Sequence, residues 1–196
     1  MRNYREEIEL ALAGGAPEIV PFTFYDGLLP QGIDVDALQA KGMALLARRS
    51  TFNKYTPNVK VTQVTEADGS VRTIYETPVG TVTSLGKAAA LGMAPIEHAI
   101  KSRDDYRVVK FIVEDAVYEP VYDFYRHEIA QMGDKGKVIA HTGYEPLLDI
   151  QITWVGQEQF CYELIDNEDL VLELHEAIAE NHTKMYDVVA GSPADF

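Results

Sequence analysis

Two short, uninterrupted apolar runs constrain the fold of this chain more than any other feature. Residues 19–24 (IVPFTF) lie between Pro17 and Asp26-Gly27, and residues 137–140 (KVIA) follow two nearby glycines. Apolar runs of this length are typical of parallel strands that are buried on both faces. Helical spacing fills most of the remaining chain, over residues 3–13, 34–48, 104–112, 120–132, 145–155, 157–165 and 168–190. We therefore predict an α/β fold.

A different pattern interrupts the helices between residues 59 and 83. Val59, Val61, Val71 and Tyr75 alternate with polar residues on either side of Asp68-Gly69. An Asp-Gly pair between alternating segments is the strongest short signal for a β-hairpin. The sequence thus predicts a hairpin insertion, and residues 80–83 are expected to add a further strand.

Composition limits the classes of function. At 196 residues the chain is expected to form a single domain, and its 46% hydrophobic content favours a packed core. The formal net charge of −14 argues against nucleic acid and anionic membranes as partners, because both bind basic surfaces. No apolar run approaches the roughly 18 residues of a membrane span, and the N-terminus is too polar for a signal peptide. We expect a cytoplasmic protein.

The strand predicted at residues 137–140 ends in a cluster of polar side chains. His141, Tyr144 and Glu145 surround Gly143, and Pro146 then opens a helix. A histidine at the end of a buried strand can bind a ligand, polarise it or donate a hydrogen bond to it. The alternative is a histidine that only stabilises the turn at Gly143.

Tyr25 and Asp26 form a matching pair at the end of the first predicted strand. They are candidates for substrate binding. Asp26 is also well suited to turn chemistry with Gly27, because aspartate side chains accept hydrogen bonds from the backbone just after them.

Five segments resemble the uroporphyrinogen decarboxylase superfamily, in the expected order along nearly the whole chain. They are REEIELALAGGAPEIVPF (5–22), TPVGTVT (77–83), DYRVVKFIVEDAVYEPVYDFY (105–125), VIAHTGYEPLLDIQITWVG (138–156) and LHEAIAENHTKMYDVVAGSPADF (174–196). The resemblance implies a TIM (β/α)₈ barrel with its active site at the carboxyl ends of the strands. It would place His141, Tyr144 and Glu145, the candidate catalytic residues, at the barrel mouth, with Tyr25 and Asp26 as the candidate substrate-binding pair at the end of the first strand.

The family barrel is much longer than this chain. The resemblance therefore implies that residues 1–196 form a partial barrel, with about the first three βα units. The last helix ends at Ala190-Gly191, and a new extended segment begins after Pro193, where the fourth strand is expected. A partial barrel leaves an uncovered strand edge, so we expect self-association through that edge.

The resemblance is closest to the branch of corrinoid-dependent methyltransferases, which implies zinc, a methylated corrinoid protein as partner and a small-molecule substrate. The zinc ligands of that branch include a His-x-Cys pair. The only cysteine here, Cys161, has Gln159 in place of that histidine, and its helical setting predicts a buried structural side chain. We expect no metal on this chain and no activity from the chain alone.

Two alternatives remain open. A uroporphyrinogen-type decarboxylase binds substrate carboxylates through arginines after its first strand, but residues 21–32 (PFTFYDGLLPQG) contain no arginine. The other alternative is a short non-catalytic domain that pairs with a partner, or with itself, through its open sheet edge.

Overall fold

A computed structural model describes residues 2–89 and 92–195. The chain divides into two compact units. The first, the parallel-sheet unit, falls within residues 1–53, 120–142 and 188–196. The second, the hairpin unit, comprises residues 54–119 and 143–187. The expectation of one partial barrel over residues 1–196 stays a prediction.

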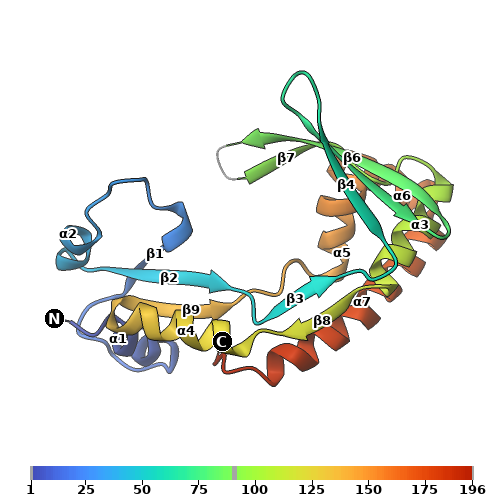
Figure 1. Ribbon diagram of the computed structural model, residues 1–196. Coiled ribbons are helices and arrows are strands. Elements are labelled where there is room, and N and C mark those ends of the chain that lie inside the picture. Colours follow the sequence, from blue (N-terminus) through green and yellow to red (C-terminus); the bar gives the residue numbers. More distant parts are fainter. Residues whose placement is uncertain (1, 90–91, 196) are drawn as a thin grey trace. The chain divides into compact units, whose positions relative to one another are not determined.

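The parallel-sheet unit contains the two strands predicted from the apolar runs. They are β1 (Phe22–Tyr25) and β9 (Gly136–Ala140), and β2 (Met43–Arg49) lies between them. Both pairings are parallel, with Phe22 beside Met43 and Leu45 beside Gly136 (Figure 1). The parallel arrangement that the runs indicated is confirmed.

The prediction of a helix over residues 34–48 is wrong in its second half. Asp34 caps α2 (Val35–Ala40) as expected, with its side chain accepting from the Ala37 amide. Gly42 then adopts a φ of +103°, a left-handed conformation that favours glycine and ends the helix. The following run MALLARR is buried at most positions and forms β2.

The prediction that residues 19–24 form a fully buried strand is also wrong. Strand β1 begins only at Phe22, and the Phe22 side chain is 63% exposed. The cause is its place at the edge of the sheet, where β2 is the one strand of the described residues that pairs with it. An apolar run alone does not distinguish an edge strand from a central one.

Helices cover the two faces of this sheet. Helix α1 (Tyr4–Leu12) packs Tyr4 and Ile8 against Ala44 of β2. On the other face, Tyr125 of α4 (Tyr122–Met132) packs against Ala47 and Val138. Since successive side chains of a strand point to opposite faces, these contacts give the sheet one helix on each side. Three-residue helical turns follow β1 and α4, at Asp26–Leu28 and Gly133–Lys135.

The hairpin unit is built around a four-stranded antiparallel sheet. Its strands, in spatial order, are β4 (Lys60–Thr65), β5 (Val71–Thr77), β6 (Gly80–Ala89) and β7 (Gly92–Glu97). The predicted hairpin at Asp68-Gly69 is confirmed, with Gly69 at a φ of +81°. The expected further strand is β6, which is longer than residues 80–83. Strand β7 was not predicted.

Helices pack against this sheet and against one another. They are α3 (Arg103–Glu114), α5 (Pro146–Asp149), a π-helix (Ile150–Val155), α6 (Gln157–Asp166) and α7 (Glu168–Ala190). The core they share is centred on Val109, Ile150, Leu174 and Ile178, all almost fully buried. Strands β3 (Phe52–Tyr55) and β8 (Val117–Pro120), which were not predicted, form a separate two-stranded sheet.

The fold is thus mixed α/β, with one parallel and one antiparallel sheet as its main elements. Within residues 2–89 and 92–195, no helix combines the length and the apolar character that a transmembrane span requires.

Candidate functional site

The carboxyl ends of the three parallel strands bring charged and aromatic side chains together. Tyr25 ends β1 and Asp26 follows it, Arg48 and Arg49 end β2, and His141 follows β9. Parallel strands end at the same edge of a sheet, and in α/β proteins this edge is the usual place for ligands. We call these five residues the carboxyl-edge cluster.

Arg49 is fixed by two carboxylates. Its Nη2 lies 2.5 Å from Asp26 Oδ2, and its Nε lies 2.5 Å from Glu128 Oε2 on α4. These hydrogen bonds, first that of Asp26 and then that of Glu128, raise the pKa of the guanidinium. Asp26 also accepts from the Gly27 amide at 2.8 Å, so the expected turn chemistry is confirmed. Arg49 therefore joins the β1 turn to α4.

Arg48 is exposed and has different partners. Its guanidinium carbon lies 5.7 Å from the centre of the Tyr25 ring, a cation–π distance. Its Nη2 lies 2.7 Å from His141 Nδ1. Among the residues that the structure describes, no carboxylate forms an ion pair with Arg48. The charge of Arg48 is consequently not neutralised by an acid within these residues.

The contact with Arg48 defines the protonation state of His141. A guanidinium can only donate, so His141 Nδ1 must accept and the imidazole proton must be on Nε2. Desolvation, and secondly the charge of Arg48, lower the pKa of His141. The backbone also positions the residue, because the His141 amide donates to the Arg49 carbonyl at 2.9 Å. His141 is thus a neutral imidazole whose Nε2–H is a hydrogen-bond donor.

The other two predicted catalytic residues, Tyr144 and Glu145, belong to the hairpin unit. Glu145 is the N-cap of α5, where its carboxylate accepts from the amides of Leu147 at 3.0 Å and Leu148 at 2.6 Å. Capping explains a glutamate at this position without a catalytic role. Tyr144 is 49% exposed. Their catalytic roles stay predictions.

The residues present do not fit the zinc that the resemblance implies. Within the described ranges, no group of three or more histidine, cysteine, aspartate or glutamate side chains is arranged to hold a metal. In the tautomer described above, His141 also has no nitrogen lone pair left for a metal. Cys161 is exposed, so the prediction that it is buried is wrong.

The sequence analysis did not identify Arg48, Arg49 or Glu128 as site residues. A signal was present, because Arg48-Arg49 directly follow the apolar run ALLA. Two charges at the end of a buried run are typical of a strand that emerges at a site. The incorrect helix over residues 34–48 concealed this signal.

A cavity of about 460 Å³ lies in the same unit, at the opposite end of the strands. It is lined by Arg2, Tyr4, Asp36, Gln39, Ala40, Asp134 and Lys135. Its central polar groups bind one another: the Tyr4 hydroxyl donates to the Gln39 carbonyl, and Gln39 Nε2 donates to the Lys135 carbonyl at 2.9 Å. These contacts hold α1 and α2 together and account for the polar residues.

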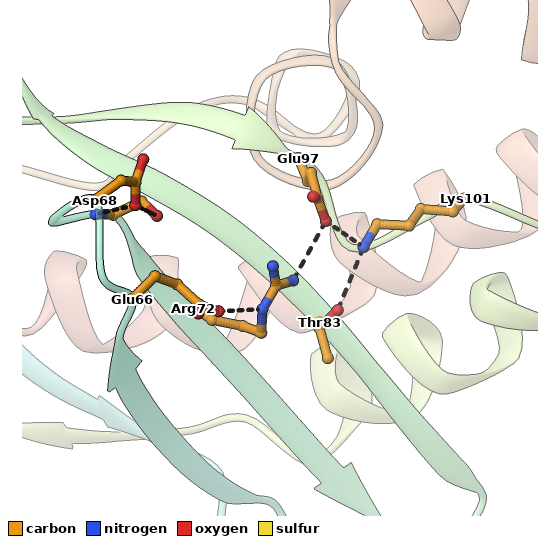
Figure 2. Close-up of polar contacts among 7 residues, drawn as sticks. Glu66, Asp68, Arg72, Thr83, Glu97 and Lys101 are labelled. Atoms are coloured by element: carbon orange, nitrogen blue, oxygen red, sulfur yellow. Dashed lines mark hydrogen bonds and ion pairs between the residues drawn. The ribbon is translucent and has the colours of Figure 1, made fainter.

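The hairpin unit carries a second cluster of charges, which form pairs with one another. Arg72 lies between Glu66, at 2.8 Å, and Glu97, at 3.4 Å, and Lys101 bonds Glu97 at 3.0 Å (Figure 2). Two bases therefore meet two acids. The cluster connects β5 with β7 across β6, and its charges are paired with one another.

Comparisons with known proteins do not assign the chain. No protein-family model matches it, and no curated protein or solved structure matches it significantly. The function is therefore argued from the site.

Proposed function

We propose that this chain is the N-terminal portion of a uroporphyrinogen decarboxylase-like TIM (β/α)₈ barrel, most similar to the corrinoid-dependent methyltransferases. We further propose that its carboxyl-edge cluster forms one wall of the substrate site. One observation carries the proposal: the three parallel strands β1, β2 and β9 end in a cluster that contains an arginine without an acidic partner among the described residues and a histidine bonded to it.

Strand order supports the barrel. In a (β/α)₈ barrel, each strand lies beside the next one in sequence. The parallel strands β1, β2 and β9 keep this order, with the strands β3 to β8 of other sheets inserted between β2 and β9. A doubly wound sheet instead reverses direction after its first strand. The sequence order of the sheet therefore favours a barrel segment over a dinucleotide-binding fold.

The segment after α7 supports a fourth strand beside β9. Ala194 packs with Val138 on one face of the sheet, while Asp195 Oδ2 reaches Lys137 Nζ at 2.9 Å. Lys137 and Val138 are consecutive and point to opposite faces. Ala194 and Asp195 thus alternate between the faces as residues of a neighbouring strand do, at the residues where β9 begins.

The cluster suggests a division of roles. Arg49, fixed by Asp26 and Glu128, positions the β1 turn. Arg48 binds an anionic group of the substrate, and His141 holds the Arg48 guanidinium in place through the contact at its Nδ1. Tyr25 supports Arg48 through its ring. Such charge-assisted hydrogen bonds select carboxylates and similar anions. No step is derived through zinc, because the residues of this chain do not fit it.

A decarboxylase is the second candidate, because of two contacts. Arginines are missing from the β1 turn itself, yet Arg49 bonds Asp26 and Arg48 lies over Tyr25. The cations that a decarboxylase needs beside its first strand are therefore supplied by β2. The −14 charge of the chain opposes a polycarboxylate substrate, so this remains second.

The test uses the protein that the native host produces. Its intact mass is measured first and compared with the 21.8 kDa of this chain. A larger product is then assayed for methyl transfer from methylcobalamin to a thiol acceptor, by the loss of methylcobalamin absorbance. We expect transfer, and we expect Arg48→Met to raise the KM for an anionic thiol about 10–100-fold, the value of a charge-assisted hydrogen bond.

Mercaptoethanesulfonate and uncharged mercaptoethanol serve as matched acceptors. Arg48→Met should affect only the anionic one, and Arg126→Met, at an exposed arginine of α4, should affect neither. Carboxyl loss from a porphyrinogen without methyl transfer would favour the second candidate. A host product of 21.8 kDa that melts cooperatively as a monomer would overturn the barrel proposal, and a stable dimer of that mass would favour the short non-catalytic domain.

A further inference from the structure

The hairpin unit contains a groove that the proposed function does not use. It lies between α3 and α7 beside the β5–β6 turn and has a volume of about 440 Å³, within the range of small-molecule sites. It is lined by Val79, Arg103, Tyr106, Arg107, Lys110, Phe111, Glu114, Leu170 and Glu173.

Three cations of α3 lie along this groove. Arg103, Arg107 and Lys110 are at positions i, i+4 and i+7, so they share one face of the helix. A row of three cations is notable in a chain with a net charge of −14.

The three cations differ in their partners. Lys110 is neutralised by Glu173 at 2.5 Å and by Glu114 at 3.7 Å. Arg103 meets Asp169 at 3.4 Å. Arg107 donates to the Val79 carbonyl at 3.0 Å, and within the described residues no carboxylate pairs with it. The groove therefore has an uncompensated positive charge at Arg107.

The remaining lining is apolar near Arg107 and acidic further along α3. Tyr106 is buried and its hydroxyl donates to Glu163 at 3.1 Å, so only its ring is left for a ligand. Phe111, Leu170 and Val79 add apolar surface. Glu114, two helical turns beyond Arg107, and Glu173 of α7, which pairs with Lys110, disfavour a second negative charge in that direction.

We propose that this groove binds a small monocarboxylate with an apolar body. The carboxylate pairs with Arg107, and the apolar part contacts Phe111 and Leu170. A single negative charge fits because the far end of the groove is occupied by the Lys110–Glu173 pair. The site is independent of the carboxyl-edge cluster, so it stands or falls separately from the proposed function.

The test is a titration of the whole chain with two matched probes, naphthalene-2-carboxylate and the neutral 2-naphthylmethanol, followed by NMR. We expect saturable binding of the carboxylate, with shifts at Phe111 and Leu170, and a Kd about tenfold or more below that of the alcohol. Arg107→Met should remove this difference and leave the alcohol unaffected. Arg107→Lys should restore most of it, while Arg126→Met should change nothing.

Equal affinities for the two probes would overturn the proposal. So would an unchanged carboxylate Kd in Arg107→Met, or shifts confined to other parts of the chain. Arg107→Lys keeps the charge and the length of the side chain, so it shows whether a loss in Arg107→Met reflects binding and not folding.

Discussion

Arg72 in the hairpin unit and Arg48 in the parallel-sheet unit both lie on strands, but their surroundings differ. Arg72 is between Glu66 and Glu97, and the hydrogen bond of Glu66 is the main cause that raises its pKa. Arg48 instead contacts the Tyr25 ring and the His141 imidazole, and no acid pairs with it in the described residues.

The difference follows from sheet geometry. In the antiparallel sheet, charges from several strands meet on one face and can pair across it, as Arg72 of β5 and Glu97 of β7 do. In the parallel sheet, strand ends meet at one edge, where like charges from β2 can gather. Paired charges hold a sheet together, while an unpaired charge at a common edge is available to a ligand. Binding is therefore sought at Arg48 and not at Arg72.

The largest expected effect concerns the core of the hairpin unit. Leu174 on α7 is 1% exposed and packs in the main apolar cluster. Leu174→Ala removes buried methyl groups and leaves a cavity, so we expect a loss of about 3 kcal/mol in unfolding free energy. Urea denaturation measures it. Leu172→Ala, at a 52% exposed position of the same helix, is the control and should cost far less.

In the parallel-sheet unit, a buried charged side chain contributes to stability as Leu174 does in the hairpin unit. Lys137 is 3% exposed and bonds Glu9 at 2.8 Å and Asp195 at 2.9 Å. We expect Lys137→Ala to cost about 2 kcal/mol, below the value for fully buried pairs, because both carboxylates keep contact with water.

Lys137→Met keeps the apolar stem of the side chain, so it should cost about half as much as Lys137→Ala. Urea denaturation of the two variants separates the packing of the stem from the charge. If Met and Ala cost the same, the stem contributes nothing, and the charge alone explains the effect.

The sequence was most informative where local chemistry decides the structure. The Asp68-Gly69 turn, the Asp34 cap and the helix over residues 168–190 depend on neighbouring residues, and all three are confirmed. Strand β2 was wrongly predicted to be helical, because its apolar run ALLA is compatible with a buried helix as well as with a buried strand. Only the two flanking strands decide between them.

The site was half predictable for the same reason. Tyr25, Asp26 and His141 could be found because each follows an apolar run and precedes a glycine nearby. Arg48 is 93 residues from His141 in sequence, and their contact depends on the pairing of β2 with β9. Glu128 reaches Arg49 from a helix, so no local pattern marks it.

A smaller effect tests the comparison directly. Arg72→Gln leaves Glu66 and Glu97 without their shared partner, so we expect the melting temperature to fall by about 1–3 °C. Arg48→Gln removes no ion pair and should leave the melting temperature within about 1 °C. Differential scanning calorimetry on both variants is sufficient. An equal fall in both would mean that Arg48 is also a structural residue.

The smallest expected effect is a change in the pKa of one histidine. It is also the most specific test, because each unit contains a histidine with a lowered pKa and only one of the two should respond. Burial lowers the pKa of His182, which is 8% exposed, and desolvation followed by the charge of Arg48 lowers that of His141. Arg48→Gln removes that charge, so the His141 pKa should rise while desolvation keeps it below 6.5. His182 should not change, and it serves as the internal control in the same NMR titration.

The sign of the pH dependence follows from the same shifts. A histidine whose folded pKa lies below its unfolded value of 6.5 leaves more protons on the unfolded chain, so acid favours unfolding. The stability due to both histidines is complete above pH 6.5 and is lost as the pH falls through their folded pKa values. Arg48→Gln should therefore narrow the pH range over which His141 loses its contribution to stability, and leave that of His182 unchanged. A rise in both pKa values would show that Arg48 acts through a change in folding and not through its charge on His141.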